Sequence, residues 1–405
     1  MRKTYKQNNN TLIILLAILI SLFSIIQPQQ TFCASSNIIE IAEDLNDTVV
    51  EELDHIDFDG LNQVVLDFNA NQSNFFSLEN IKNKVYSIIA GENPVGYNSF
   101  IASLFSNIIE KILKYLPILS LIIAIGVLSN LLGGIKSKFN DKSTGNLIHL
   151  VCMFAVVVLV IGMVSNIINL TGTSIKSMVN LTNILFPILL TLMVGTGANA
   201  SAGVFQPIVA IVSTYVADFF SFFILPLFTA SFVFNIISNL NDGIKLDKFN
   251  SFIQSLFKWS VGLIFTLFFA IFSIQGITAG KFDSLSIRTT KYTIKSYIPV
   301  MGGYLSDGMD LILASTVLIK NSVGVVGILL IASTILSPII EIAIFSLMLK
   351  LISAVIQPMG NNKVSNFLSA TSKSITMFST AIIAIGFMYL LSVGFIMTTS
   401  NMVVL

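Results

Sequence analysis

The sequence predicts an all-α protein. We expect a polytopic helical membrane bundle of six to eight spans, with broken helices, a candidate inverted repeat and a small exported helical segment at the N-terminus. Two observations lead to this prediction. Of the 405 residues, 54% are hydrophobic and only 11% are charged, whereas a soluble domain has about 25% charged residues. The apolar residues also gather in long runs from residue 116 onward, which is typical of membrane helices.

Residues 1–36 have the features of a secretory signal peptide. Arg2, Lys3 and Lys6 form a basic start, Leu12–Ile26 is an apolar core, and small residues before residue 37 offer a cleavage site. The alternative is an uncleaved first span, although the apolar core is shorter than the roughly 20 residues that a span usually needs.

The next segment, residues 37–115, is expected to be extracytoplasmic, acidic and helical. Residues 37–110 contain 13 Asp and Glu but only two Lys, and their apolar residues fall at helical spacing. Two interpretations stay open. The segment is either a small cap with a solvated acidic face or a docking surface for another extracytoplasmic protein.

Residues 116–405 form the predicted transmembrane bundle. We expect spans near 116–132, 147–168, 181–197, 204–236, 259–279, 304–319, 322–356 and 376–398. An exported N-terminus and the positions of Lys and Arg place segments 133–146, 280–303 and 357–375 in the cytoplasm, by the positive-inside rule. In this topology Lys176 and Lys320 lie in outside loops.

The most unusual stretch is residues 187–207, PILLTLMVGTGANASAGVFQP. An apolar run stops at glycines and small polar residues and then resumes, which predicts a tight connection or a broken helix. Freed backbone groups are tolerated in a membrane only inside protein or next to water. We therefore expect the segment to line a cavity. The candidate helix-break residues are Gly195, Gly197 and Gly203, and the candidate polar lining residues are Asn199 and Gln206.

A short internal repeat is visible. The sequence around Lys176 resembles that around Lys295, and each copy is followed by a proline and then by glycines, which in the second copy are Gly302 and Gly303. Downstream, Ser201 corresponds to Ser322. The predicted topology would make the copies inverted in the membrane, an arrangement typical of transporter folds.

Two carboxylates within apolar runs, Asp218 and Glu341, are the leading candidates for chemistry, because charged residues inside a membrane are rare and costly. One hypothesis is an ion or proton site that faces a polar cavity. The other is a hydrogen bond to Ser, Thr or Asn of a neighbouring helix, which stabilises many membrane bundles.

The stretch 281–300 alternates basic with apolar and aromatic residues. The basic residues Lys281, Arg288, Lys291 and Lys295 predict an interfacial amphipathic helix on the anionic cytoplasmic leaflet. A cytoplasmic partner protein that docks there is the alternative. Asp307 and Asp310 follow the glycine pair, either as helix-capping residues or at the mouth of a pore.

Enzyme activity is not expected. His55 and His149 have no neighbouring metal-ligand partner, the chain lacks a phosphate-binding glycine loop, and Cys33 and Cys152 cannot form a disulfide framework. We accordingly expect no cofactor, no metal site and no nucleic-acid partner.

Three stretches carry a resemblance to a known family. They are YIPVMGGYLSDGMDLILASTVLIKNSVGVVG (297–327), KFDSLSIRTTKYTIKS (281–296) and GTGANASAGVFQP with LPLFTASFVFNIISNL (225–240). Together they resemble the stage III sporulation protein AE family of endospore-forming bacteria. The order of leader, exported acidic segment and bundle is also similar, so the resemblance covers nearly the whole chain.

The resemblance implies a multi-pass protein of the mother-cell membrane around the forespore. It implies a secretion-like assembly that supports late forespore gene expression, whose other members are an AA-type ATPase and the AG and AH ring proteins. It gives no catalytic residues. We expect a channel or permease-like component of this assembly that also contacts membrane lipid. The alternatives are a stand-alone ion-coupled secondary transporter and a non-conducting membrane scaffold of the same assembly.

Overall fold

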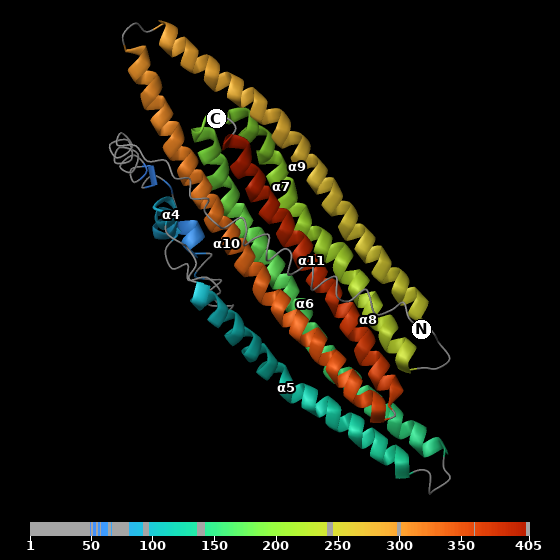
Figure 1. Cartoon of the computed structure of the whole chain (residues 1–405). Helices are drawn as coiled ribbons and strands as arrows, with labels where there is room; N and C mark the ends of the chain where they lie inside the picture. The colour runs from blue at the N-terminus through green and yellow to red at the C-terminus, as the bar shows by residue number, and fades with distance from the viewer. Residues whose placement is uncertain are drawn as a thin grey trace.

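In the computed structural model the chain forms long helices that lie side by side and alternate in direction (Figure 1). The structure describes residues 81–91, 97–135, 142–240, 246–297, 301–359 and 361–401, together with scattered positions between 49 and 66. The predicted signal peptide, residues 1–36, lies outside the described residues.

Every described element is helical. The elements are α4 (Ile81–Ile89), α5 (Tyr97–Ile135), α6 (Lys142–Gly195), α7 (Asn199–Phe219), η2 (Phe220–Ile224), α8 (Leu225–Leu240), α9 (Asp247–Tyr297), α10 (Gly302–Ile356), η3 (Gln357–Met359) and α11 (Asn362–Asn401). Within the described residues, six helices are long and apolar enough to cross a membrane. This result confirms an all-α polytopic bundle at the lower end of the expected range of spans.

The predicted spans 147–168 and 181–197 are one helix, α6, which runs without interruption through Lys176. The polar residues between the two runs predicted a loop, and this prediction is wrong. The hydroxyls of Thr171 and Ser174 donate to the backbone carbonyls of Ile167 and Leu170, four residues earlier. Side chains that bond back to their own helix in this way keep a polar stretch helical in an apolar environment.

The predicted spans 304–319 and 322–356 are likewise one helix, α10, so Lys320 is not in a loop. Its side chain is fully buried, and its Nζ donates to the backbone carbonyl of Met397 in α11 at 2.8 Å. A lysine within an apolar run usually indicates exposure to water. Here an acceptor from a neighbouring helix satisfies it inside the bundle.

The two continuous helices change the predicted topology. Helices α5, α8 and α10 end at one end of the bundle, where α6, α9 and α11 begin. The α6–α7 turn, the end of α9 and the start of α10 lie at the other (Figure 1). Segment 280–303 is therefore at the opposite end from 133–146 and 357–375, which corrects its placement on the same side. The described N-terminal positions and α4 flank the upper half of α10, nearer to the 298–301 end.

The candidate inverted repeat is also wrong. Lys176 lies in α6 and Lys295 in α9, and these two helices run in the same direction (Figure 1). Ser201 lies at the start of α7, whereas its proposed counterpart Ser322 lies well inside α10. The matched residues therefore occupy different depths in helices of the same orientation.

Helices α10 and α11 form the centre of the bundle. In their most apolar windows 67% and 56% of residues are buried, compared with 22% for α9. The hydroxyls of Ser346 and Ser372 each donate to the other's backbone carbonyl, and Ser353 and Ser365 repeat this arrangement seven residues away on each helix. Small side chains of this kind let two membrane helices approach closely.

Candidate functional site

The carboxylate of Glu341 lies at the contact between α5 and α10. One oxygen, Oε1, accepts hydrogen bonds from Lys114 Nζ at 2.5 Å and from Tyr115 Oη at 2.6 Å. The other, Oε2, lies 3.3 Å from Lys111 Nζ. The Glu341 side chain is only 4% exposed. Four polar groups therefore meet inside segments that are apolar enough to cross a membrane.

The helical repeat of α5 explains how three of these groups converge. Positions 111, 114 and 115 follow the spacing of one helix face, and the side chains at all three positions reach Glu341 on α10. The opposite face exposes Phe105, Ile109, Leu113 and Leu116, which suits contact with lipid. Asn107 completes the inner face: its side chain is buried, and its amide has no hydrogen-bond partner in the described structure.

The cluster is asymmetric in its exposure. The Lys111 side chain is 12% exposed and also lies 3.6 Å from Glu110, whereas the Lys114 side chain is 51% exposed. The sequence predicts that Glu341 is part of an ion or proton site or forms a hydrogen bond with Ser, Thr or Asn of a neighbouring helix. The partners in the structure are instead two lysines and a tyrosine. Neither Lys111 nor Lys114 is among the candidate residues that the sequence analysis names.

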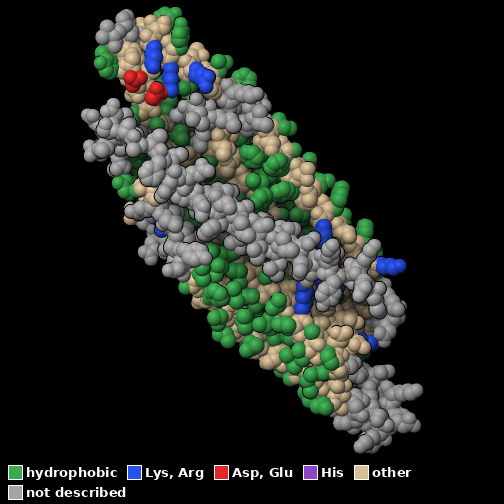
Figure 2. All heavy atoms as spheres, in the orientation of Figure 1, with side chains coloured by type: hydrophobic (Ala, Val, Ile, Leu, Met, Phe, Trp, Pro, Cys, Tyr) green, Lys and Arg blue, Asp and Glu red, His purple; other side chains and the backbone are tan. Residues whose placement is uncertain are grey.

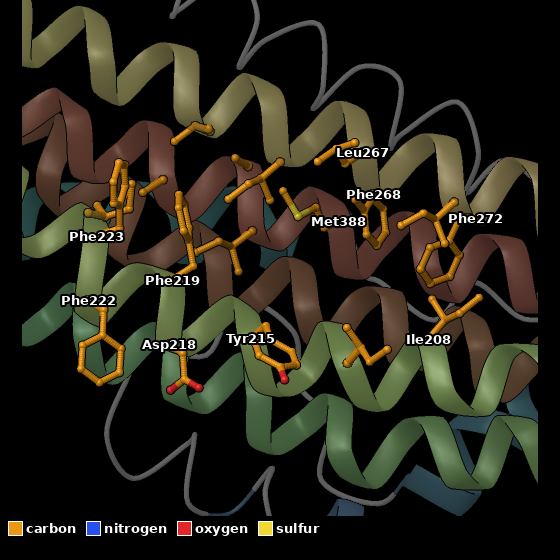
Figure 3. Close-up of a pocket in the computed structure, with 18 residues that line it drawn as sticks. Ile208, Tyr215, Asp218, Phe219, Phe222, Phe223, Leu267, Phe268, Phe272 and Met388 are labelled. Carbon is orange, nitrogen blue, oxygen red and sulfur yellow. The ribbon is translucent and has the colours of Figure 1, made fainter.

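Asp218 has different surroundings. It is exposed on α7 and lines an apolar groove of about 600 Å³ between α7, η2, α9 and α11. Figure 3 shows Tyr215, Asp218 and Phe222 along one edge of the groove, with Leu267, Phe268 and Met388 across from them. No hydrogen bond or ion pair joins Asp218 to any described residue.

A π-helical turn lies immediately after Asp218. Element η2 spans Phe220–Ile224, and the N–H of Leu225 donates to the carbonyl of Phe220, five residues earlier. Pro226 explains the wider turn, because a proline ring clashes with the carbonyl four residues before it in a regular α-helix. Single π-helical turns occur frequently at functional sites. This one leaves the Phe222 ring 80% exposed at the edge of the groove.

The break after Gly195 is a tight turn between α6 and α7. Gly197 has a φ of 78°, its N–H donates to Val194, and the N–H of Ala198 donates to Met193. These two bonds form a Schellman motif, which ends helices at a glycine in the left-handed region. A Cβ on Gly197 would lie 2.5 Å from Ile287, so the close approach of α9 also requires glycine.

Asp283 caps the start of α7. Its two carboxylate oxygens accept hydrogen bonds from the backbone N–H groups of Ala200 and Ser201, at 2.8 and 2.9 Å. Sequence reasoning missed this residue, because it lies in a stretch that was interpreted by its basic residues alone. Its only sequence signal is an acidic residue within an otherwise basic helix.

The remaining candidates of this stretch do not form a cavity lining with Asp218. Asn199, Gln206 and Gly203 are all exposed, and none of them lines the groove. Gly302 has a packing role, because a Cβ there would lie 2.6 Å from the carbonyl oxygen of Ile294 in the preceding helix. A Cβ on Gly303 would meet nothing within 4 Å.

The basic stretch is the last part of α9 and not a separate helix. Lys281, Arg288, Lys291 and Lys295 all belong to α9, which pairs with the start of α10 as a hairpin that extends beyond the α6–α7 turn (Figure 1). Figure 2 shows basic and acidic side chains gathered near this end of the molecule. Lys291 pairs with Asp310, and Lys295 lies 3.9 Å from Asp307. These aspartates thus bridge the hairpin, and neither caps α10.

The described residues contain no group of three or more His, Cys, Asp or Glu side chains that could hold a metal ion. The arrangement that remains is a charged contact between α5 and α10 and, on another side of the bundle, a carboxylate at an apolar groove. The first can hold two helices together or let them separate. The second can attract a cation from outside the bundle.

The chain is similar in sequence to a known protein family and to a protein of that family. A model of the stage III sporulation protein AE family matches residues 79–400. The chain is also 23% identical over 324 residues to stage III sporulation protein AE of Bacillus subtilis (strain 168), covering 80% of this chain and 81% of that protein. No solved structure matches the chain.

Proposed function

Because the chain belongs to the stage III sporulation protein AE family, its role is in sporulation, and we propose that it is a channel or permease-like component of an assembly between mother cell and forespore. The observation that supports this proposal best is the charged cluster of Glu341, Lys111, Lys114 and Tyr115 between α5 and α10. Ionisable groups at membrane depth commonly mark transport pathways and the contacts that gate them.

In this proposal the α5–α10 contact separates to open a path. Three features support it. The contact depends on charge, the inner face of α5 continues to the unsatisfied amide of Asn107, and Lys114 is half-exposed, so one side of the cluster is open to its surroundings. The stand-alone ion-coupled transporter has less support, because three donors already occupy the carboxylate that would bind the ion.

The non-conducting scaffold is the second candidate. The observation that favours it is the same set of contacts, because Glu341 is satisfied on both oxygens and a satisfied charge pair can act purely as a structural link. The two candidates differ in one respect. A scaffold needs only attraction between α5 and α10, whereas a gate also needs the carboxylate on α10 and the ammonium groups on α5.

A charge reversal separates the two candidates. In the spore-forming host, the gene is replaced by a variant that carries Glu341→Lys, Lys114→Glu or both. Two quantities are measured in each strain: the abundance of the protein and the activity of a late forespore reporter. Each single change is expected to lower abundance. The double variant keeps an opposite-charge contact and is expected to restore abundance while the reporter stays silent. Recovery of both in the double variant would contradict the channel proposal and support the scaffold.

We extend the proposal to location and partners. The protein would lie in the mother-cell membrane around the forespore. The N-terminal segment and the α9–α10 hairpin would face the space between the two membranes, toward the AG and AH ring proteins. The opposite end, where α5, α8 and α10 end, would face the AA-type ATPase. Cysteines introduced at Tyr297 and Lys363 test this arrangement. A membrane-impermeant thiol reagent should label only Tyr297→Cys from outside the mother cell membrane.

A further inference from the structure

The groove beside Asp218 is placed where a membrane lipid would meet the bundle. Its walls include Phe222 and Ile224 from the candidate span Phe220–Leu240, and Val261 and Ile264 from the candidate span Asp247–Ile274. Alanines from α11, Ala381 and Ala384, form part of its lining and leave room that larger side chains would fill. Its volume of about 600 Å³ lies in the range of small-molecule sites.

Charge determines what the groove can hold. Among the described residues, Asp218 is the only charged one that lines the groove, and no described side chain pairs with it. Asp218 lies directly before the candidate span Phe220–Leu240, and a carboxylate beside apolar walls is costly there unless a cation or a hydrogen-bond donor meets it. The occupant should therefore carry a positive group next to an apolar chain.

The neighbouring rings favour an ammonium group. Tyr215, Asp218 and Phe222 occupy positions three and four residues apart on α7 and η2, so they share one edge of the groove (Figure 3). The Tyr215 and Phe222 side chains are 65% and 80% exposed. Aromatic faces attract cations, and a carboxylate accepts strong hydrogen bonds from a protonated amine.

We propose that this groove binds one phospholipid with a primary ammonium headgroup. The ammonium lies at Asp218 between the two rings, and an acyl chain lies along the groove toward Val261 and Ala384. A lipid fits this groove, because its apolar walls suit an acyl chain and the carboxylate at its edge suits a cationic headgroup. A phosphatidylglycerol head offers no cation, and a choline head cannot donate hydrogen bonds to the carboxylate.

Native mass spectrometry of the full-length protein tests the proposal. The detergent-purified protein is incubated with dioleoyl phosphatidylethanolamine, phosphatidylcholine or phosphatidylglycerol, and retained lipids are counted. We expect one phosphatidylethanolamine, held about tenfold more strongly than either of the other lipids, since a hydrogen bond to a charged group contributes about that factor. Asp218→Asn should remove the preference among the lipids, and Ala384→Phe should prevent retention by filling the groove.

Asp307→Asn is the matched control, because Asp307 is also an exposed carboxylate but lies on the α9–α10 hairpin away from the groove. It should leave lipid retention unchanged. Equal retention of the three lipids, or an Asp218→Asn protein that still prefers phosphatidylethanolamine, would overturn the proposal. A cysteine at Phe222 that forms a disulfide-linked dimer under mild oxidation in a Cys152→Ala background, without lipid retention, would instead assign the groove to a second copy of the chain.

Discussion

Two carboxylates of similar appearance in the sequence lie in opposite environments. Glu341 is buried between α5 and α10, where two lysines and a tyrosine satisfy both of its oxygens. Asp218 is exposed at the edge of an apolar groove and forms no hydrogen bond or ion pair with any side chain of the described structure. The comparison teaches that a carboxylate in apolar surroundings can find its charged or hydrogen-bonding partners either in the same chain or in another molecule. In the second case, the proposed lipid headgroup would be the partner.

The strongest way to break this comparison is to remove each carboxylate in turn. Glu341→Leu leaves Lys111 nearly buried with only the exposed Glu110 nearby, and breaking a buried charge pair on one side costs about 3–5 kcal/mol. We expect a large fall in the melting temperature of the detergent-purified protein. Asp218→Leu is the matched control and should leave the melting temperature unchanged or raised, because it adds an apolar side chain to an apolar groove. Equal losses would contradict the distinction between the two sites.

A second prediction concerns the wall of the groove. Asp283 holds the first turn of α7 through two backbone N–H groups. Replacing a capping side chain by alanine costs about 0.5–2 kcal/mol. Asp283→Ala should therefore lower the melting temperature by less than Glu341→Leu does. It should also increase hydrogen exchange at Ala200 and Ser201 while exchange in α11 stays unchanged. Uniform exchange across the bundle would show that the cap does not act locally.

The fold class was predictable, because composition and the length of apolar runs determine that a chain spans the membrane as helices. The position of the α6–α7 turn was also predictable, since Gly195 and Gly197 interrupt an apolar run. The continuity of α6 and α10 was not predictable from local polarity. Hydroxyls that bond to their own backbone, and a carbonyl from α11 that accepts from Lys320, compensate for polar residues that otherwise indicate a loop.

The site could be predicted only in part. Asp218 and Glu341 are recognisable because carboxylates within apolar runs are rare, but the partners of these residues depend on packing between distant parts of the chain. Lys114 is 227 residues away from Glu341, and Asp283 is 82 residues from Ser201. A single sequence gives no register between α5 and α10 or between α7 and α9. The mistaken topology had a separate cause, which is the two loops predicted within α6 and α10, because each inserted loop reverses the direction of every later span.

A third, smaller effect concerns the contact between α10, which carries Glu341, and α11, which lines part of the groove beside Asp218. Ser346 and Ser372 exchange reciprocal hydrogen bonds, and such contacts between membrane helices contribute on average about 0.6 kcal/mol. Ser346→Ala and Ser372→Ala should each lower stability slightly, and the double variant should lose less than the sum of the two. Thr398→Ala is a suitable control, because its hydroxyl bonds only within its own helix. Strict additivity would contradict a shared contact.

The smallest effect should come from Asp218→Asn in detergent without added lipid. An exposed side chain with no partner among the described residues contributes little, and surface substitutions of this kind usually stay within about 0.5 kcal/mol. Added phosphatidylethanolamine should make the melting temperatures of the unmodified protein and Asp218→Asn differ, because a ligand that binds only the folded protein raises its stability. The lipid is expected to raise the melting temperature of the unmodified protein more than that of Asp218→Asn. If both proteins respond equally, the stabilisation is a general effect of lipid, and Asp218 then requires an explanation other than a headgroup.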